Sequence, residues 1–194
     1  MSQKKVVFYL DSGEIVSRRS GTVANVDIAI EASSLNHVDI TRVDHDVTVE
    51  DYYVSDNAVL AKGERPSESY TFNYASGSWE LDIELAKGYK WESIKDSRNA
   101  QEFGTFEWGG YTFQCDEVSQ RRIQGAVQLS AIDDTLTLDW TLADNSVQTF
   151  TAADYIQIGQ ALAVHVSQCH ERGRILRLEI EAATTLEELE AIVW

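Results

Sequence analysis

Proline, cysteine and positive charge are all scarce in this chain, and each shortage argues against a class of protein. One of the 194 residues is proline and two are cysteine. Two cysteines are too few for a fold that disulfides hold together, so we expect Cys115 and Cys169 to be free thiols. Hydrophobic residues make up 43% of the chain, enough to bury a core. The composition therefore predicts a globular protein stabilised by apolar packing.

Acidic residues outnumber basic ones two to one. The chain carries 16 Lys and Arg against 32 Asp and Glu, which gives a formal net charge of −16. A nucleic-acid-binding surface needs clustered cations to contact phosphates. The small basic clusters, Arg121–Arg122 and the arginines of residues 172–177, are expected to pair with nearby carboxylates instead. The charge balance therefore argues against a nucleic-acid partner.

Long apolar runs are absent as well. No stretch approaches the length that a membrane-spanning helix needs. The run at residues 6–10 is too short for the hydrophobic part of a secretion signal. We therefore expect no membrane span, and we expect the chain to be made and folded in a cytoplasm.

Recognisable catalytic motifs are missing. The sequence has no nucleophile elbow, no phosphate-binding Gly-rich loop, no His-Glu-x-x-His and no Cys-x-x-Cys. His165 and Cys169 share one helix face and would allow a zinc site, but no second closely spaced ligand pair accompanies them. His45 alternates with Asp44 and Asp46 on an expected strand, so it faces away from both. We expect no catalytic residues, no metal site and no cofactor.

The first eighty residues show the alternation of antiparallel strands. Runs that predict strands cover residues 6–10, 14–17, 22–31, 37–43 and 47–53. The first two runs flank an Asp-Ser-Gly turn and predict a hairpin. A polar stretch around Pro66, at about residues 61–69, predicts a linker. We expect a β-rich antiparallel N-terminal domain over residues 1–81.

From Asp82 onward the pattern changes to helices and tight hairpins. Apolar positions at spacings of three and four predict a helix after Asp82, and Gly109-Gly110 between aromatic runs predicts a two-residue turn. The residues placed to cap later helices are Asp116, Thr151 and Thr185. We expect an α+β domain over residues 82–194, with two hairpins and three to four helices including one long C-terminal helix. The chain as a whole is thus predicted to be α+β.

Several runs in the second half resemble, in order, a C-terminal domain of unknown function that is common in tail proteins of tailed bacteriophages. They are WESIKDSR (91–98), GYTFQCD (110–116), SQRRIQGA (119–126), WTLADN (140–145), the helical stretch around His165, and AATTLEEL (182–189) ahead of Trp194. The similarity extends back to about Tyr52. The proline-rich stretch that usually precedes this domain is reduced here to Pro66.

The resemblance implies a structural or adaptor component of a phage tail, at the baseplate or tail-fibre end, that binds proteins and does not catalyse a reaction. The N-terminal domain would attach to one virion protein, and the C-terminal domain to another or to copies of itself. The implied partners are other tail, baseplate or tail-fibre proteins, and the implied location is the virion tail. The alternative is a tail-fibre assembly chaperone that leaves the particle. An enzyme acting on surface glycans would need paired carboxylates, which the sequence does not place.

Aromatic and apolar residues outside the expected cores mark candidate interfaces. Trp91 and Trp140 have periodic placement and are expected in the core. The candidate interface residues are Trp108 at the hairpin tip, Tyr111, Ile156 and Val164 off the main apolar face of the long helix, and Trp194. The apolar residues on more than one side of that helix predict a homo-oligomer. Because phage tails have threefold and sixfold axes, a trimer is favoured, with the long helix near the axis.

Overall fold

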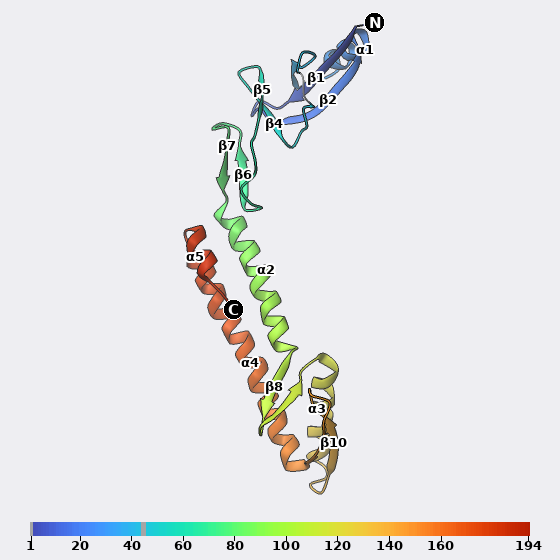
Figure 1. Cartoon of the computed structure of the whole chain (residues 1–194), viewed down its shortest axis with the longest axis vertical. Coiled ribbons are helices and arrows are strands. Elements are labelled where there is room, and N and C mark those ends of the chain that lie inside the picture. Colours follow the sequence, from blue (N-terminus) through green and yellow to red (C-terminus); the bar gives the residue numbers. More distant parts are fainter. Residues whose placement is uncertain (1, 44–45) are drawn as a thin grey trace. The chain divides into compact units, whose positions relative to one another are not determined.

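The computed structural model describes residues 2–43 and 46–194 and divides the chain into two compact units, Met1–Asp82 and Ile83–Trp194 (Figure 1). Both units combine antiparallel strands with helices, which confirms the α+β class. The division falls one residue from the expected domain boundary. Asp44 and His45 of the Asp44–Asp46 stretch lie outside the described residues.

A three-stranded antiparallel sheet begins the first unit. Its strands are β1 (Gln3–Tyr9), β2 (Ile15–Thr22) and β3 (Asn36–Asp39), with β1 in the middle. Helix α1 (Val23–Glu31) follows β2 directly. On one face of β1, Val6 and Phe8 pack against Val26 of this helix. The opposite face carries Val7, which joins a second cluster formed by Ile15, Ile40, Val47 and Val54.

Two short hairpins complete the first unit. They are β4 (Tyr52–Ser55) with β5 (Ala58–Ala61), and β6 (Tyr70–Asn73) with β7 (Ser78–Leu81). The polar run between the hairpins is tied to the second one: Arg65 Nε donates to the Tyr70 carbonyl at 2.9 Å, and its guanidinium lies 5.7 Å from the Trp79 ring centre. The stretch expected as a linker therefore packs on β6 and β7.

The strand expected at residues 22–31 is wrong, because Thr22 ends β2 and residues 23–31 form α1. Apolar side chains occupy most positions of the run, so both the strand and the helix period fit it. The burial of Val26 against the sheet selects the helix. The next two expected strands are also shorter than predicted, since β3 ends at Asp39 and β4 begins only at Tyr52.

The second unit alternates helices with two hairpins. Its helices are α2 (Ile83–Glu102), α3 (Glu117–Ser130), α4 (Ala152–Ala182) and α5 (Leu186–Ala191). Its strands are β8 (Thr105–Trp108), β9 (Tyr111–Gln114), β10 (Thr137–Thr141) and β11 (Val147–Thr151). Gly109 and Gly110, with φ of 61° and 81°, make the tight turn between β8 and β9. In Figure 1, α2 runs alongside the C-terminal part of α4, within this unit.

The helix starts follow the expected caps. Asp116 accepts hydrogen bonds from the backbone N–H groups of Val118 and Ser119, at 2.9 and 3.1 Å. Capping boxes begin α4, with Thr151 and Asp154, and α5, with Thr185 and Glu188. Each cap satisfies backbone donors that the first helical turn leaves open.

The core of the second unit is centred on Phe150. Its ring centre lies 5.4 to 6.1 Å from those of Trp108, Tyr111, Phe113 and Tyr155. Buried residues from α3 and α4, among them Ile123 and Ile158, extend this cluster between the helices. No helix among the described residues is both long and apolar enough to cross a membrane.

Candidate protein-binding groove

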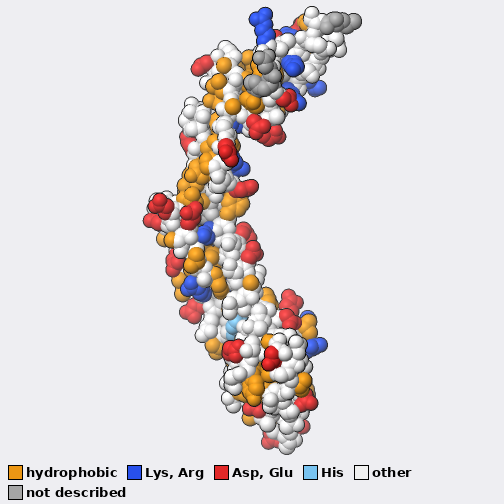
Figure 2. Space-filling view, viewed as in Figure 1, with side chains coloured by type: hydrophobic (Ala, Val, Ile, Leu, Met, Phe, Trp, Pro, Cys, Tyr) orange, Lys and Arg blue, Asp and Glu red, His pale blue; other side chains and the backbone are white. Residues whose placement is uncertain are grey.

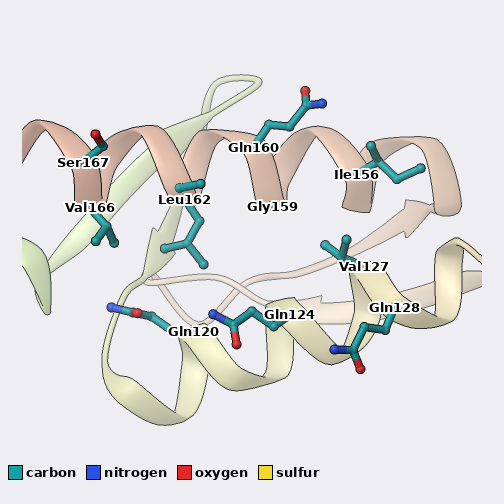
Figure 3. A pocket seen from close by; sticks show the side chains of 11 residues that line it. Gln120, Gln124, Val127, Gln128, Ile156, Gly159, Gln160, Leu162, Val166 and Ser167 are labelled. Carbon is teal, nitrogen blue, oxygen red and sulfur yellow. The ribbon is translucent and has the colours of Figure 1, made fainter.

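Helices α3 and α4 approach closely at Gly159. A Cβ on this glycine would lie only 2.6 Å from Cγ2 of Val127, a separation that side chains do not tolerate. Val127 thus occupies the space that a side chain at position 159 would need. The close approach leaves an open groove along one side of the helix pair, with a volume of about 800 Å³ (Figure 3).

The groove has an apolar floor and amide-rich rims. From α3 it is lined by Gln120, Gln124, Val127 and Gln128, and from α4 by Ile156, Gly159, Gln160, Leu162, Ala163, Val166 and Ser167. None of these lining residues is charged, although charged residues form 25% of the chain. Figure 2 shows acidic side chains scattered over the visible face of the molecule. An uncharged surface of this extent is therefore unusual for this protein.

The side chains are ordered by helix periodicity. Gln120, Gln124 and Gln128 recur every four residues, so they lie on one face of α3. Gln120 is held in place because its Nε2 donates to the Cys115 carbonyl at 2.9 Å. In Figure 3, Leu162 and Val166 point from α4 toward α3, whereas Gln160 and Ser167 point away from it. The amides thus border an apolar floor on both sides.

The structure brings one of the five candidate interface residues into the groove. Ile156 lines it and is 41% exposed, whereas Val164 is 54% exposed but is not among the lining residues. The rings of Trp108 and Tyr111 meet Phe150 edge-on at 5.9 and 5.4 Å, so both are half-buried against the core. Trp194, the last residue of the second unit, is half-buried and does not line the groove.

The glutamines were not singled out from the sequence, although a signal for them was present. Three glutamines at a spacing of four, on a helix whose other exposed positions include Arg121 and Arg122, indicate an uncharged stripe beside a charged one. The groove itself needed the distance between two helices. That distance depends on the pairing of Gly159 with Val127, which lie far apart in the sequence.

The two tryptophans expected in the core are only half-buried. Trp91 packs beneath the guanidinium of Arg177, which lies 5.2 Å from the centre of the ring. Trp140 contacts Phe113 and Tyr155, and its buried Nε1 has no hydrogen-bond partner in the structure. Trp140 is packed against the Phe150 cluster, as expected, whereas Trp91 is not among the residues that pack against it.

The side chains that bear on a zinc site, the His165–Cys169 pair together with His170 and Cys115, are buried or lie close to other polar groups. Cys115 and Cys169 are free and buried, and burial raises both pKa values, that of Cys115 to about 11. His165 Nε2 lies 3.1 Å from the Gln101 carbonyl, and His170 Nε2 lies 3.2 Å from a carboxylate oxygen of Glu102. Within the described parts of the chain, no group of three or more His, Cys, Asp or Glu is arranged to hold a metal ion.

The fold and the groove together define an α+β protein with an uncharged groove between two helices. Residues 86–193 match the family described as a domain of unknown function, DUF4376. This match covers more than half of the chain, so the protein belongs to that family. Comparisons with curated proteins and with solved structures give no match. All residues that line the groove lie within the family domain.

Proposed function

We propose that this protein acts by binding other proteins, as a structural or adaptor component of a bacteriophage tail at the baseplate or tail-fibre end. The observation that supports a binding role is the groove between α3 and α4, which is apolar, uncharged and open to solvent. Exposed apolar surfaces with a polar rim are typical of protein–protein contacts. The tail assignment is supported by the ordered resemblance of residues 91–189 to a domain common in tail proteins.

The shape of the groove suits a helix. Two packed helices offer a trough into which a third can lay one face, with apolar side chains on the floor and polar groups along the rims. Leu162 and Val166 supply apolar floor, and the α3 amides can donate to or accept from polar groups of the incoming chain. Such contacts need neither a metal nor a titrating side chain.

The partners in this proposal are other tail, baseplate or tail-fibre proteins, together with further copies of the chain. The protein would be made in the cytoplasm of the bacterial host and would reside in the virion tail. Tail symmetry by itself favours three copies around one axis.

The test is the protein composition of purified particles. Quantitative mass spectrometry should find this chain in them at a fixed ratio to known tail proteins. If the chain is abundant in the lysate but absent from particles, the assembly-chaperone alternative replaces the tail-component proposal.

A substitution in the groove tests whether incorporation into particles depends on this groove. Ile156→Glu places a carboxylate in the groove, so incorporation into particles should fall, because burial of an unpaired charge is unfavourable. Gln157→Glu adds the same charge at an exposed neighbouring position that does not line the groove, and it should be incorporated normally. Equal incorporation of the two variants would contradict a role for the groove.

A further inference from the structure

We propose that the groove between α3 and α4 binds α4 of a second copy of this chain, with the two α4 helices antiparallel around a twofold axis. The inference rests on the proposed function in one respect, since it names a partner for the same groove. Four residues on the exposed edge of α4, and the absence of charged residues from the groove lining, support this pairing.

The four residues form a seam along α4. Ile156, Gln160, Ala163 and Ser167 are spaced by four, three and four residues, the spacing that keeps side chains on one edge of a helix in contact with a second helix. All four are exposed and all four line the groove. The seam of one copy therefore lies beside the groove that would receive the seam of the other.

The absence of charge favours a second copy of the same chain. Two chains that each carry a formal charge of −16 repel one another, and the repulsion is weakest where the contact surface holds no carboxylate. Residues near a twofold axis also lie close to their own copies, even where they do not face them directly. Carboxylates or lysines would then face like charges, whereas a glutamine amide carries both donors and an acceptor and can pair with another amide. The lining of this groove holds no carboxylate and no other charged side chain, and its rims carry glutamine amides.

The order of large and small side chains favours the antiparallel arrangement. When two seams run in opposite directions, Ile156 faces Ser167 of the second copy, and Gln160 faces its Ala163. Each long side chain then meets a short one, so the ridge of one helix fills the space left by the other. In a parallel ring, as in a trimer, each residue would meet its own copy, and Ala163 and Ser167 would leave gaps. We therefore favour a twofold pair over the threefold arrangement.

The contact is short, which determines how it should be measured. Residues 156–167 span about 16 Å at the usual rise per residue of a helix. An interface of this length is expected to be weak, with dimers that dissociate on dilution. Sedimentation velocity of the whole chain, from about 1 to about 300 µM, should therefore show a shift from monomer to dimer by mass action.

Ala163→Glu tests whether the seam makes the contact. The substitution retains a good helix former but places a carboxylate opposite the uncharged Gln160 of the other copy, so the dimer should weaken about tenfold or more. The control is Gln157→Glu, which adds the same charge at an exposed position of α4 off the seam and should dimerise nearly as wild type does, apart from the added long-range charge. Circular dichroism checks that both variants stay folded.

Cysteine cross-linking tests the direction of the helices. Antiparallel pairing places position 160 of one copy next to position 163 of the other. A mixture of Gln160→Cys and Ala163→Cys proteins should thus form a disulfide-linked dimer faster than either protein alone. The native thiols, Cys115 and Cys169, are buried, and wild-type protein measures their background.

The outcomes separate this inference from the proposed function. Concentration-dependent dimers that Ala163→Glu weakens, together with preferential mixed cross-links, support the inference. A monomer at every concentration, a trimer, or preferential self-linkage of Gln160→Cys would overturn it. None of these results changes whether the chain is found in purified particles, which is the test of the tail assignment.

Discussion

The two units of this molecule are stabilised in different ways. Among the described residues, the first unit buries its apolar side chains in separate clusters, with three residues around Val6 and five around Val7. The second unit has a larger cluster, with ten buried residues and seven partly buried ones around Phe150, and further buried residues such as Ile94, Leu176 and Leu189 lie outside it. Because the largest cluster lies in the second unit, we expect that unit to unfold more cooperatively than the first.

The reason lies in the length of the elements. The β4–β5 and β6–β7 hairpins of the first unit are built from four-residue strands, and an isolated hairpin of this size is marginal in water. The second unit contains the same kind of hairpin, but α3 and the 31-residue helix α4 cover its strands. We therefore expect the first unit to unfold at lower denaturant concentration than the second.

The largest effect is expected from Phe150→Ala. This ring is 3% exposed and meets four other aromatic rings, so its removal should destabilise the second unit by about 3–5 kcal/mol. Phe72→Ala is the matched change in the first unit, where the ring is half-buried beside Tyr53 and Trp79. It should cost roughly half as much. Denaturant melts followed by tryptophan fluorescence measure both, and equal losses would contradict the contrast between the two units.

A smaller change in the free energy of unfolding is expected when the glycines of α3 and α4 are replaced by alanine, and the two replacements should have opposite signs. Gly159→Ala would drive a methyl group into Val127, and this overpacking should outweigh the gain in helix propensity and destabilise the unit by about 1–2 kcal/mol. Gly125→Ala meets nothing within 4 Å and should stabilise by up to about 1 kcal/mol. Thermal unfolding of the two variants decides the point. If both stabilise, α3 and α4 are not in tight contact at Gly159.

In the first unit, Arg65→Ala should cost about 1 kcal/mol, the scale of a hydrogen bond or a cation–π contact at a partly exposed site. The guanidinium lies over Trp79, and Arg65 donates to the backbone carbonyls of Glu68 and Tyr70 at 2.6 and 2.9 Å. The change should increase the rate of amide exchange in β6 and β7 and leave the second unit unaffected. Arg65→Lys keeps the charge but not the planar group, so it should recover only part of the protection.

The smallest effect is expected on the dependence of stability on acidic pH. Hydrogen bonds lower the pKa of several carboxyl groups in the second unit, those of Asp116, Asp133, Asp144, Asp154 and Glu188, and of Asp39 in the first. A carboxyl group with a lowered pKa stabilises the fold above its unfolded pKa, and the contribution disappears as the pH falls through the folded value. The second unit should therefore lose more stability in acid than the first.

Asp116→Asn isolates one of these groups. Hydrogen bonds from Ser119, first from its side chain and then from its backbone, lower the pKa of Asp116 below 3.8. Asparagine is also a good N-cap but does not titrate. The variant should stay close to wild type at neutral pH and show a shallower loss of stability below about pH 4. Chemical denaturation at both pH values tests this, and an unchanged slope would exclude Asp116 as a contributor.

Features that depend on local chemistry could be predicted from the sequence. The Gly109-Gly110 turn needs positive φ at two successive residues, and Asp116, Thr151 and Thr185 are the side chains that helix starts prefer. Both kinds of signal lie within four residues of the structure that they specify. They placed the β8–β9 turn and the starts of α3, α4 and α5, whereas α2 was placed by the spacing of its apolar residues.

Features that depend on packing could not be predicted in this way. Residues 22–31 satisfy two periodicities, and contact with the sheet decides between them. The groove depends on how near α3 comes to α4, and a sequence pattern contains no distance between elements. For the same reason, Ile156 was identified as apolar and off the main face, but its place in the groove was not.

The two buried thiols, Cys115 and Cys169, can report local opening of the second unit. A reagent modifies a cysteine only while the thiol is open to solvent, so each rate of modification measures how often its surroundings separate. Cys115 would react when the segment between β9 and α3 leaves the core, and Cys169 when α4 moves away from Arg98 and Glu102 of α2. The first unit contains no cysteine. The two rates therefore distinguish two openings of a single unit without any added label.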